Sequence, residues 1–260
     1  MPNNLIMGVV NVTPDSFSDG GCFFKPEDAV DQVLRLIDDG ADIIDIGAES
    51  SRPGAELISS DLEWQRLEPV LEKLFQRDVG CQISIDTNKD ETMLRLVDTP
   101  VEIINDIKGG ASRPTLEALA VKGMTYIAMH MHHTPETMQL DPLDGDDAVR
   151  KVEAFFESTA ERLQHCGFSL DRIWLDPGIG FGKTDRANIA LIKSSMAQAS
   201  TWPLVVGLSR KSFIGRLLGI DDPLERDHPS KMLELALMLA PVKAIRTHDV
   251  ATLRRLRDHL

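Results

Sequence analysis

Polar and charged side chains recur along this chain, each at the end of a short apolar run or just after it. Eight residues share that position: Asn11, Glu49, Asp86, Asn105, His130, Asp176, Lys211 and His248. Carboxylates and amides can pair with the donors and acceptors of a polar ligand, and basic side chains can neutralise an anionic one. One polar residue after a strand is usually a turn or a helix cap. Such residues after nearly every strand, all on one edge, would instead favour a binding or catalytic site.

The first apolar run, residues 5–10, leads into a long polar segment, residues 11–21. That segment contains two aspartates, two serines, a threonine, an asparagine and one aromatic residue, Phe17. Gly20 and Gly21 leave its backbone free to take more than one conformation. By composition alone, a solvated surface loop and a loop that closes over a ligand are equally consistent with it.

The elements that must position these side chains alternate regularly along the chain. We expect strands near residues 5–10, 42–47, 82–87, 101–106, 124–130, 172–176, 203–208 and 243–248. Between and after them, eight helical segments or groups are expected near residues 26–39, 60–76, 89–97, 114–122, 147–166, 188–198, 212–239 and 250–260. This alternation predicts an α/β fold with parallel strands. Eight units fit a closed (β/α)8 TIM barrel formed by one domain, residues 1–260, and an open doubly wound sheet is the main alternative.

Two local patterns support specific expectations. Ser60 and Glu63 have the spacing of a capping box, which predicts that Ser60 caps the second helix. The glycines at 178, 180 and 182, followed by Lys183, resemble a phosphate-binding loop but do not fit the Walker pattern. We expect them to allow close approach of the backbone instead.

A cluster of histidines, at positions 130, 132 and 133, suggests a metal site at first sight. No partner residue with ligand spacing follows nearby, so we interpret His132 and His133 as loop residues.

Composition excludes several classes of function. The formal net charge of −13 argues against a general nucleic-acid surface and against binding to an anionic membrane. No apolar segment approaches the ~20 residues that a membrane span needs. The three cysteines, Cys22, Cys81 and Cys166, lie far apart, as expected in a reducing compartment. With no signal peptide at the N-terminus, we expect a cytoplasmic protein.

Seven motifs together resemble the dihydropteroate synthase family. In one-letter code they are NVTPDSFSDGG (11–21), ESSRPG (49–54), SIDT (84–87), INDI (104–107), LDPGIGFGK (175–183), GLSRKS (207–212) and RTHD (246–249). Each motif alone is weak, but the set occurs in the order of the family and spans nearly the whole chain. The resemblance implies a pterin-binding barrel of folate biosynthesis, which joins 6-hydroxymethyl-7,8-dihydropterin pyrophosphate to p-aminobenzoate and releases pyrophosphate with Mg2+.

The resemblance also implies which residues bind the pterin and perform the catalysis. The implied pterin-binding residues are Asp86, Asn105, Met129, Asp176, Phe181, Gly207 and Lys211. The implied catalytic residues are Asp86, Lys211, Arg246 and His248.

For the other two ligands, the resemblance implies residues near the pyrophosphate and around p-aminobenzoate. The implied pyrophosphate contacts are Asn11, Ser51, Arg52, Arg246 and His248, with Asn11 also the contact to Mg2+. The implied residues of the p-aminobenzoate pocket and its loops are Thr13, Asp15, Phe17, Pro53 and Ser212. That pocket suggests sensitivity to sulfonamides.

Two departures from the family pattern concern loop order and assembly. Ser51 stands where most members have threonine, and residues 229–232 read Pro-Ser-Lys-Met where members usually have a Gly-Ser-Leu-Ala-like helix start. The resemblance implies a homodimer, and the second departure touches the helix that often forms the dimer contact. Two alternative functions are a methyltetrahydrofolate-dependent methyltransferase and a catalytically silent pterin-binding paralogue. For Arg210, pairing with a surface carboxylate is the preferred interpretation.

Overall fold

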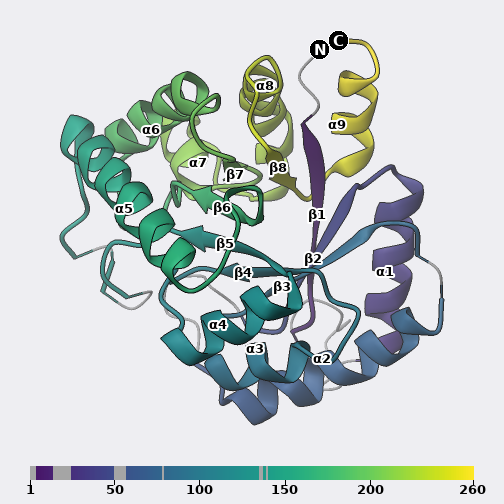
Figure 1. Cartoon of the computed structure of the whole chain (residues 1–260). Helices are drawn as coiled ribbons and strands as arrows, with labels where there is room; N and C mark the ends of the chain where they lie inside the picture. The colour runs from purple at the N-terminus through teal and green to yellow at the C-terminus, as the bar shows by residue number, and fades with distance from the viewer. Residues whose placement is uncertain (1–3, 14–24, 50–56, 78, 135–136, 139) are drawn as a thin grey trace.

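A computed structural model describes residues 4–260 except 14–24, 50–56, 78, 135–136 and 139. Its centre is a sheet of eight parallel strands (Figure 1). The strands are β1 (Leu5–Asn11), β2 (Ile43–Gly47), β3 (Gln82–Asp86), β4 (Ile103–Asp106), β5 (Thr125–Met129), β6 (Ile173–Asp176), β7 (Val205–Gly207) and β8 (Ala244–Thr247). Their order is β6-β5-β4-β3-β2-β1-β8-β7, so each strand lies beside its neighbours in sequence and β1 pairs with β8.

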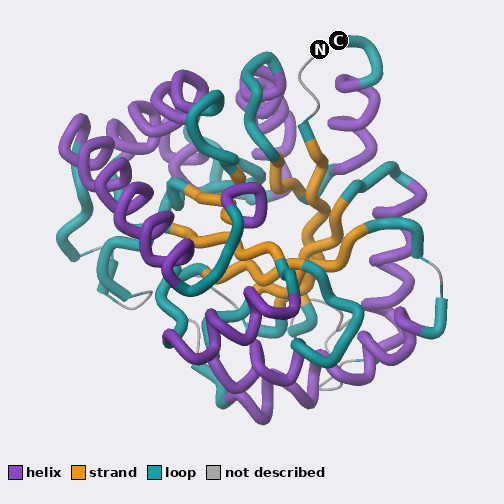
Figure 2. The backbone as a smooth tube through the Cα atoms, viewed as in Figure 1, coloured by secondary structure: helices purple, strands orange, loops and turns teal. Residues whose placement is uncertain are grey.

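The sheet closes on itself between β6 and β7. The backbone N–H of Leu175 donates to the carbonyl of Pro203 at 3.0 Å, and Leu175 forms a parallel bridge with Leu204. Figure 2 shows the strands as a ring with helices outside it. The expected (β/α)8 barrel is therefore confirmed, and the open doubly wound sheet is excluded.

Helices connect successive strands on the outside of the barrel. In the described residues they are α1 (Pro26–Asp38), α2 (Ser60–Phe75), α3 (Asp90–Leu96), α4 (Arg113–Lys122), α5 (Gly145–His165), α6 (Asp185–Gln198), α7 (Ser212–Leu218), α8 (Asp227–Met238) and α9 (Val250–Arg257). Sequence signals set several ends: Pro26 opens α1, and Gly123 ends α4 with a φ of 78°. Within these described residues, no helix combines the length and apolarity of a membrane span.

The cap of α2 differs from the expected one. The side chain of Ser59, not Ser60, accepts the backbone N–H of Leu62 at 3.2 Å. Glu63 is fully buried, and its carboxylate accepts the hydroxyls of Thr87 and Thr92. The capping-box prediction was therefore wrong, because the spacing alone does not show that Glu63 faces the barrel and not the start of its own helix.

Alternation along the strands divides the apolar core into two parts. One side-chain set faces outward and packs under the helices, with members such as Ile44, Ile85 and Tyr126. The other set fills the inside of the barrel and consists of Met7, Ile43, Ile103, Ile127, Trp174, Val205 and Ala244, with Leu5 against it. Because successive side chains of a strand point to opposite faces, the residue two positions further along also faces inward. We call the inner set the barrel floor.

Candidate active site

The site is the next layer of inward-facing residues above the barrel floor. Two positions beyond the floor residues of β2 and of β4 to β8 stand Asp45, Asn105, Met129, Asp176, Gly207 and Arg246. Asp86 joins this layer because it pairs in register with Asn105. Each of these residues lies at or near the C-terminal end of its strand, where barrels of this kind carry their active sites. Six of the expected site residues are thus brought together by strand alternation.

Arg246 lies between two carboxylates of this layer. Its Nε donates to Oδ2 of Asp45 at 2.7 Å, and one terminal nitrogen donates to Oδ2 of Asp86 at 3.0 Å. Asp45 is fully buried, whereas the side chain of Arg246 is 24% exposed. One guanidinium thus serves two carboxylates and still has an open side from which it can contact a ligand.

Asp45 was missed by the sequence analysis. Besides Arg246, its carboxylate accepts the Ser84 hydroxyl at 2.7 Å and the Asn105 side-chain amide at 3.0 Å. Asp45 therefore holds the side chains of Asn105 and Arg246 in position. The signal that could have found it is an aspartate in the middle of an otherwise apolar strand, at the same inward parity as the floor residue Ile43.

The surroundings of Asp86 make it a weaker acid than an ordinary aspartate. Burial, and after it the charge of Asp45, raise its pKa to about 7, although Arg246 acts in the opposite direction. Asp86 can therefore accept or keep a proton near neutral pH.

Asp176 and Lys211 form the opposite side of the layer. Oδ1 of Asp176 accepts the backbone N–H of Gly178 at 2.7 Å, and burial raises the pKa of its carboxyl. The ammonium of Lys211 lies 4.3 Å from the centre of the Phe181 ring, a cation–π contact. Burial lowers the pKa of Lys211 to about 8. Lys211 thus lies over the Phe181 ring and near enough to Asp176 for the two charges to interact.

The glycines at 178 and 182 allow two loops to pack closely, as expected. Both have positive φ, and a Cβ at Gly178 would lie 1.9 Å from the carbonyl oxygen of His130. A Cβ at Gly182 would lie 2.7 Å from the carbonyl oxygen of His132. The loop carrying Phe181 therefore rests on the segment that follows β5.

Lys183 connects these two segments from inside. It is 2% exposed, and its three donors match three acceptors at 3.0 Å: His130 Nδ1, the His130 carbonyl and the Phe181 carbonyl. Burial lowers the pKa of Lys183 to about 7, and burial together with the charge of Lys183 lowers that of His130 to about 3, so Nδ1 can accept. Sequence reasoning gave Lys183 no role.

We expect Lys183→Met to reduce the rise of stability with pH. An ordinary lysine has a pKa near 10.5, so between about 7 and 10.5 the unfolded chain binds more protons at Lys183 than the folded one. Stability should therefore rise with pH over that interval through this residue. Urea unfolding of wild type and Lys183→Met at pH 7 and 9.5 should show a smaller rise in the variant. The same rise in both proteins would contradict the role of Lys183.

The basic residues expected near an anion lie beside this layer. Nδ1 of His248 lies 2.9 Å from the Ser209 hydroxyl, which also accepts the backbone N–H of His248. Burial, and then the charges of Arg210 and Arg246, lower the pKa of His248 to about 3. Arg210 forms a bidentate pair with Asp227, which confirms the interpretation that it pairs with a carboxylate.

Some residues that follow strands have structural partners. Glu49 pairs with Lys89 at 2.7 Å and accepts the backbone N–H of Ile58. His130 points to Lys183 and packs edge-on against Phe155. Glu49 and His130 lie at strand ends, as expected, and their contacts hold the neighbouring loop segments in place.

The remaining predicted residues divide into described and undescribed ones. Asn11 ends β1 and pairs in register with Gly47, next to Asp86 on the adjacent strand. Thr13 follows it, and Ser212 begins α7 directly after Lys211. Five predicted residues lie outside the described part of the chain: Asp15, Phe17, Ser51, Arg52 and Pro53.

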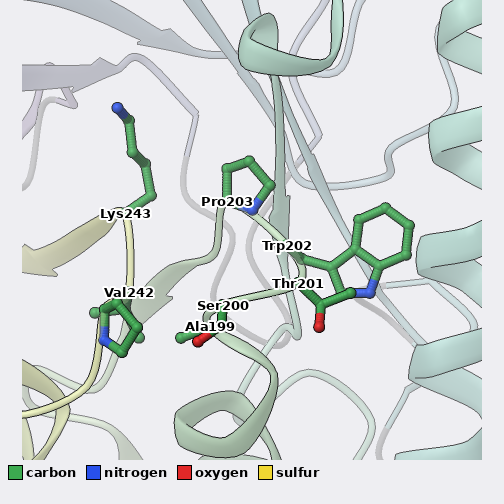
Figure 3. A pocket seen from close by; sticks show the side chains of 8 residues that line it. Ala199, Ser200, Thr201, Trp202, Pro203, Val242 and Lys243 are labelled. Atoms are coloured by element: carbon green, nitrogen blue, oxygen red, sulfur yellow. The ribbon is translucent and has the colours of Figure 1, made fainter.

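A surface hollow of about 280 Å³ lies at the other end of the barrel. Its lining includes Trp202, Pro203, Val242 and Lys243, which precede β7 and β8 (Figure 3). The ammonium of Lys243 lies 5.0 Å from the ring centre of Trp174, a residue of the barrel floor. Active sites of such barrels lie at the C-terminal ends of the strands, whereas this hollow lies at the N-terminal ends of β7 and β8. The hollow is therefore separate from the candidate site.

Comparison with known proteins identifies close relatives over nearly the whole chain. The model of the family "Pterin binding enzyme" matches residues 7–248. The dihydropteroate synthase of Escherichia coli K12 is 40% identical over 247 residues, which cover 94% of this chain and 86% of that protein. That of Synechocystis is 37% identical over 253 residues, with 96% and 87% covered.

Two solved structures show the same likeness in three dimensions. Yersinia pestis dihydropteroate synthase in a sulfonamide drug complex superposes with a TM-score of 0.89 at 36% identity, covering 98% of this chain and 92% of that one. The Xanthomonas albilineans enzyme in complex with 7,8-dihydropteroate gives a TM-score of 0.84 at 33% identity, with the same coverage of 98% and 92%.

Proposed function

This chain belongs to the pterin-binding enzymes and, among them, to the dihydropteroate synthases, and on that premise we propose how its residues share the reaction. The enzyme condenses 6-hydroxymethyl-7,8-dihydropterin pyrophosphate with p-aminobenzoate to give 7,8-dihydropteroate and pyrophosphate in folate biosynthesis. The observation that supports the proposed roles best is the polar layer above the barrel floor, where Arg246 joins Asp45 and Asp86.

The pterin ring is held edge-on by the buried amide and carboxylates. Asn105 and Asp176 offer donors and acceptors for the pyrimidinone edge, and Asp86 serves the other side of the ring. Met129 and Phe181 supply apolar walls, and Gly207 leaves room beside Arg246 because it has no side chain. The Lys211 ammonium, which lies over the Phe181 ring, contacts the pterin ring from that side.

The leaving pyrophosphate needs cationic partners as its charge develops. Arg246 supplies the positive charge, and the neutral imidazole of His248 supplies a hydrogen bond. The family motif assigns Ser51 and Arg52 to the pyrophosphate as well. The bond between the pterin methylene carbon and the pyrophosphate oxygen breaks, and the aniline nitrogen of p-aminobenzoate forms the new C–N bond and loses a proton. The family motifs assign Thr13, Asp15, Phe17, Pro53 and Ser212 to p-aminobenzoate. Their proposed role is to exclude water, which would otherwise trap the electron-poor carbon.

Mg2+ fits the donor at the end of β1. Magnesium prefers oxygen ligands and is commonly bound by one or two protein groups together with substrate phosphates and water. The amide oxygen of Asn11 is such a donor. Asn11 pairs in register with Gly47 on β2, and Gly47 pairs in turn with Asp86 on β3. When bound, the ion would neutralise charge on the pyrophosphate, which Asn11 would orient.

The proposal predicts a narrow pH optimum for kcat/KM. Asp86 becomes a carboxylate as the pH rises through about 7, and Lys211 loses its ammonium as the pH rises through about 8. Both groups have the required charge between these values, so activity should fall on either side. In Lys211→Arg the alkaline limb should move above pH 9, because a guanidinium stays protonated there. If the alkaline limb stays at the same pH in Lys211→Arg, the role of Lys211 is contradicted. A limb caused by ionisation of the substrate would be the same in wild type and variant.

The function itself is tested by pyrophosphate release from dihydropterin pyrophosphate and Mg2+, with and without p-aminobenzoate. Release that depends on p-aminobenzoate, with dihydropteroate as product, is the expected result. Saturable pterin binding without release would favour the methyltransferase or the silent paralogue. The same assay tests sulfonamide sensitivity: a sulfonamide should raise the apparent KM for p-aminobenzoate and leave kcat unchanged.

We also propose that the enzyme is a homodimer, with α8 in the contact. Met232 and Leu239 lie on and directly after α8 with 60% and 65% of their surface exposed. Light scattering after size-exclusion chromatography should give twice the mass of the chain, and a charged residue at Met232 should shift the mass toward the monomer. A monomeric wild type would contradict the proposal.

A further inference from the structure

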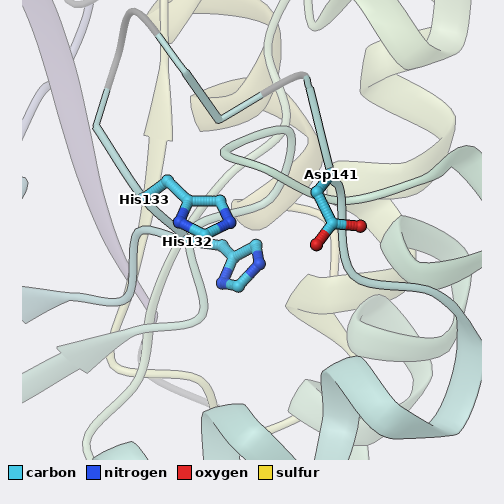
Figure 4. Close-up of side chains that lie close together, drawn as sticks. All are labelled: His132, His133 and Asp141. Atoms are coloured by element: carbon cyan, nitrogen blue, oxygen red, sulfur yellow. The ribbon is translucent and has the colours of Figure 1, made fainter.

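Two histidines and an aspartate converge on the loop between β5 and α5. One ligand atom from each of His132, His133 and Asp141 lies within 4.8 Å of the other two. Figure 4 shows the two imidazoles side by side, with the carboxylate of Asp141 turned toward them. His132 and His133 are loop residues, as expected. The expectation that no partner lies near them was wrong, because Asp141 lies within 4.8 Å of both.

The backbone explains this convergence. Neighbouring residues in extended chain point to opposite sides, but His133 has a φ of 64°, which turns its ring to the side of His132. The ring centres are 3.9 Å apart. Further along the loop, the N–H of Met138 donates to the carbonyl of Thr134 at 2.8 Å, and Asp141 lies close to both histidines.

The three side chains have no competing partners among the described residues. Neither imidazole nor the Asp141 carboxylate hydrogen-bonds or ion-pairs with another described side chain, and the rings contact only each other. One ligand atom from each of the three residues therefore faces the same space.

We propose that His132, His133 and Asp141 bind one divalent transition-metal ion of the zinc type. Two imidazole nitrogens and one carboxylate oxygen are a common zinc ligand set, with water in the remaining position. Ligand atoms around one zinc ion lie about 3.4 Å apart, so these side chains need to move inward by roughly 1 Å. His133 and Asp141 are exposed and His132 is half-buried. This site is distinct from the Mg2+ contact at Asn11, because imidazole is a poor ligand for magnesium.

Both ends of the loop are anchored, so a bound ion would act as a clamp. The N–H of Leu143 donates to the carbonyl of Gly182, and the N–H of Thr184 donates to the carbonyl of Leu143, each at 2.9 Å. Gly182 in turn packs on the carbonyl of His132. Metal binding should therefore rigidify the loop that supports Phe181.

Calorimetric titration of the whole chain with Zn2+, in excess Mg2+, tests the proposal. We expect one equivalent to bind, and His132→Ala, His133→Ala and Asp141→Asn each to weaken the affinity at least 10-fold. Co2+ should give visible d–d absorption that the same variants lose. His165→Ala is the matched control, because His165 is also an exposed histidine but lies on α5 with Nδ1 near the Glu161 carbonyl.

Circular dichroism shows whether each variant folds, so weaker Zn2+ binding caused by a lost ligand can be distinguished from weaker binding caused by unfolding. Unchanged binding in the folded variants, no saturable binding at one equivalent, or equal loss in His165→Ala would overturn the proposal. A thermal-shift measurement adds a second readout: Zn2+ should raise the Tm of wild type and of His165→Ala, and not that of His133→Ala.

Discussion

Replacing Lys211 by alanine should lower kcat for p-aminobenzoate-dependent pyrophosphate release by about 100- to 1,000-fold, the usual effect of removing one donor from a buried charged site. Lys211 is the cation that faces Asp176 and covers the Phe181 ring, so its loss removes charge complementarity at the proposed reaction centre. The fold should survive, because a lysine ammonium held in a low-dielectric site is itself costly. Steady-state kinetics together with urea unfolding measure both effects.

Lys243→Ala is the matched control for that experiment. Lys243 also places its ammonium over an aromatic ring, Trp174, but at the opposite end of the barrel. Its replacement should leave kcat within about 2-fold of wild type. Equal losses in the two variants would mean that Lys211 acts through general stability, and wild-type turnover in Lys211→Ala would refute the proposed site.

The barrel could be predicted because its strands are short apolar runs separated by helical periodicity. Strand alternation then explains why the predicted residues meet: Asn105, Asp176 and Arg246 each stand two positions beyond a floor residue. These facts are local in the sequence, and the parallel order of the strands follows from the connecting helices.

Contacts between distant segments could not be predicted in the same way. Glu63 looks like an ordinary surface acid in the sequence, yet it is fully buried and accepts hydrogen bonds from Thr87 and Thr92. Lys183 contacts His130, which lies 53 residues earlier in the chain, and Asp141 lies close to His132, nine positions before it. Which polar residues become buried depends on partners that the sequence does not place.

Replacing Asp45 should have the largest effect on stability. Asp45→Ala leaves the Arg246 guanidinium with one carboxylate and leaves Ser84 and Asn105 without their acceptor. Breaking a buried ion pair costs about 3–5 kcal/mol of unfolding free energy. Urea unfolding should show a loss of that size, together with weaker binding of dihydropterin pyrophosphate. A loss below about 1 kcal/mol would contradict the supporting role of Asp45.

Asp45→Asn separates the charge of Asp45 from its shape. Asparagine can still accept one hydrogen bond, so the protein should fold, but the negative charge that helps to raise the pKa of Asp86 is gone. The acid limb of kcat/KM should therefore move from about pH 7 to lower pH. Ser84→Ala removes one hydrogen bond to Asp45 and no charge, so its limb should stay near 7. If both variants shift the limb equally, packing around Asp45 and not its charge sets the proton affinity of Asp86.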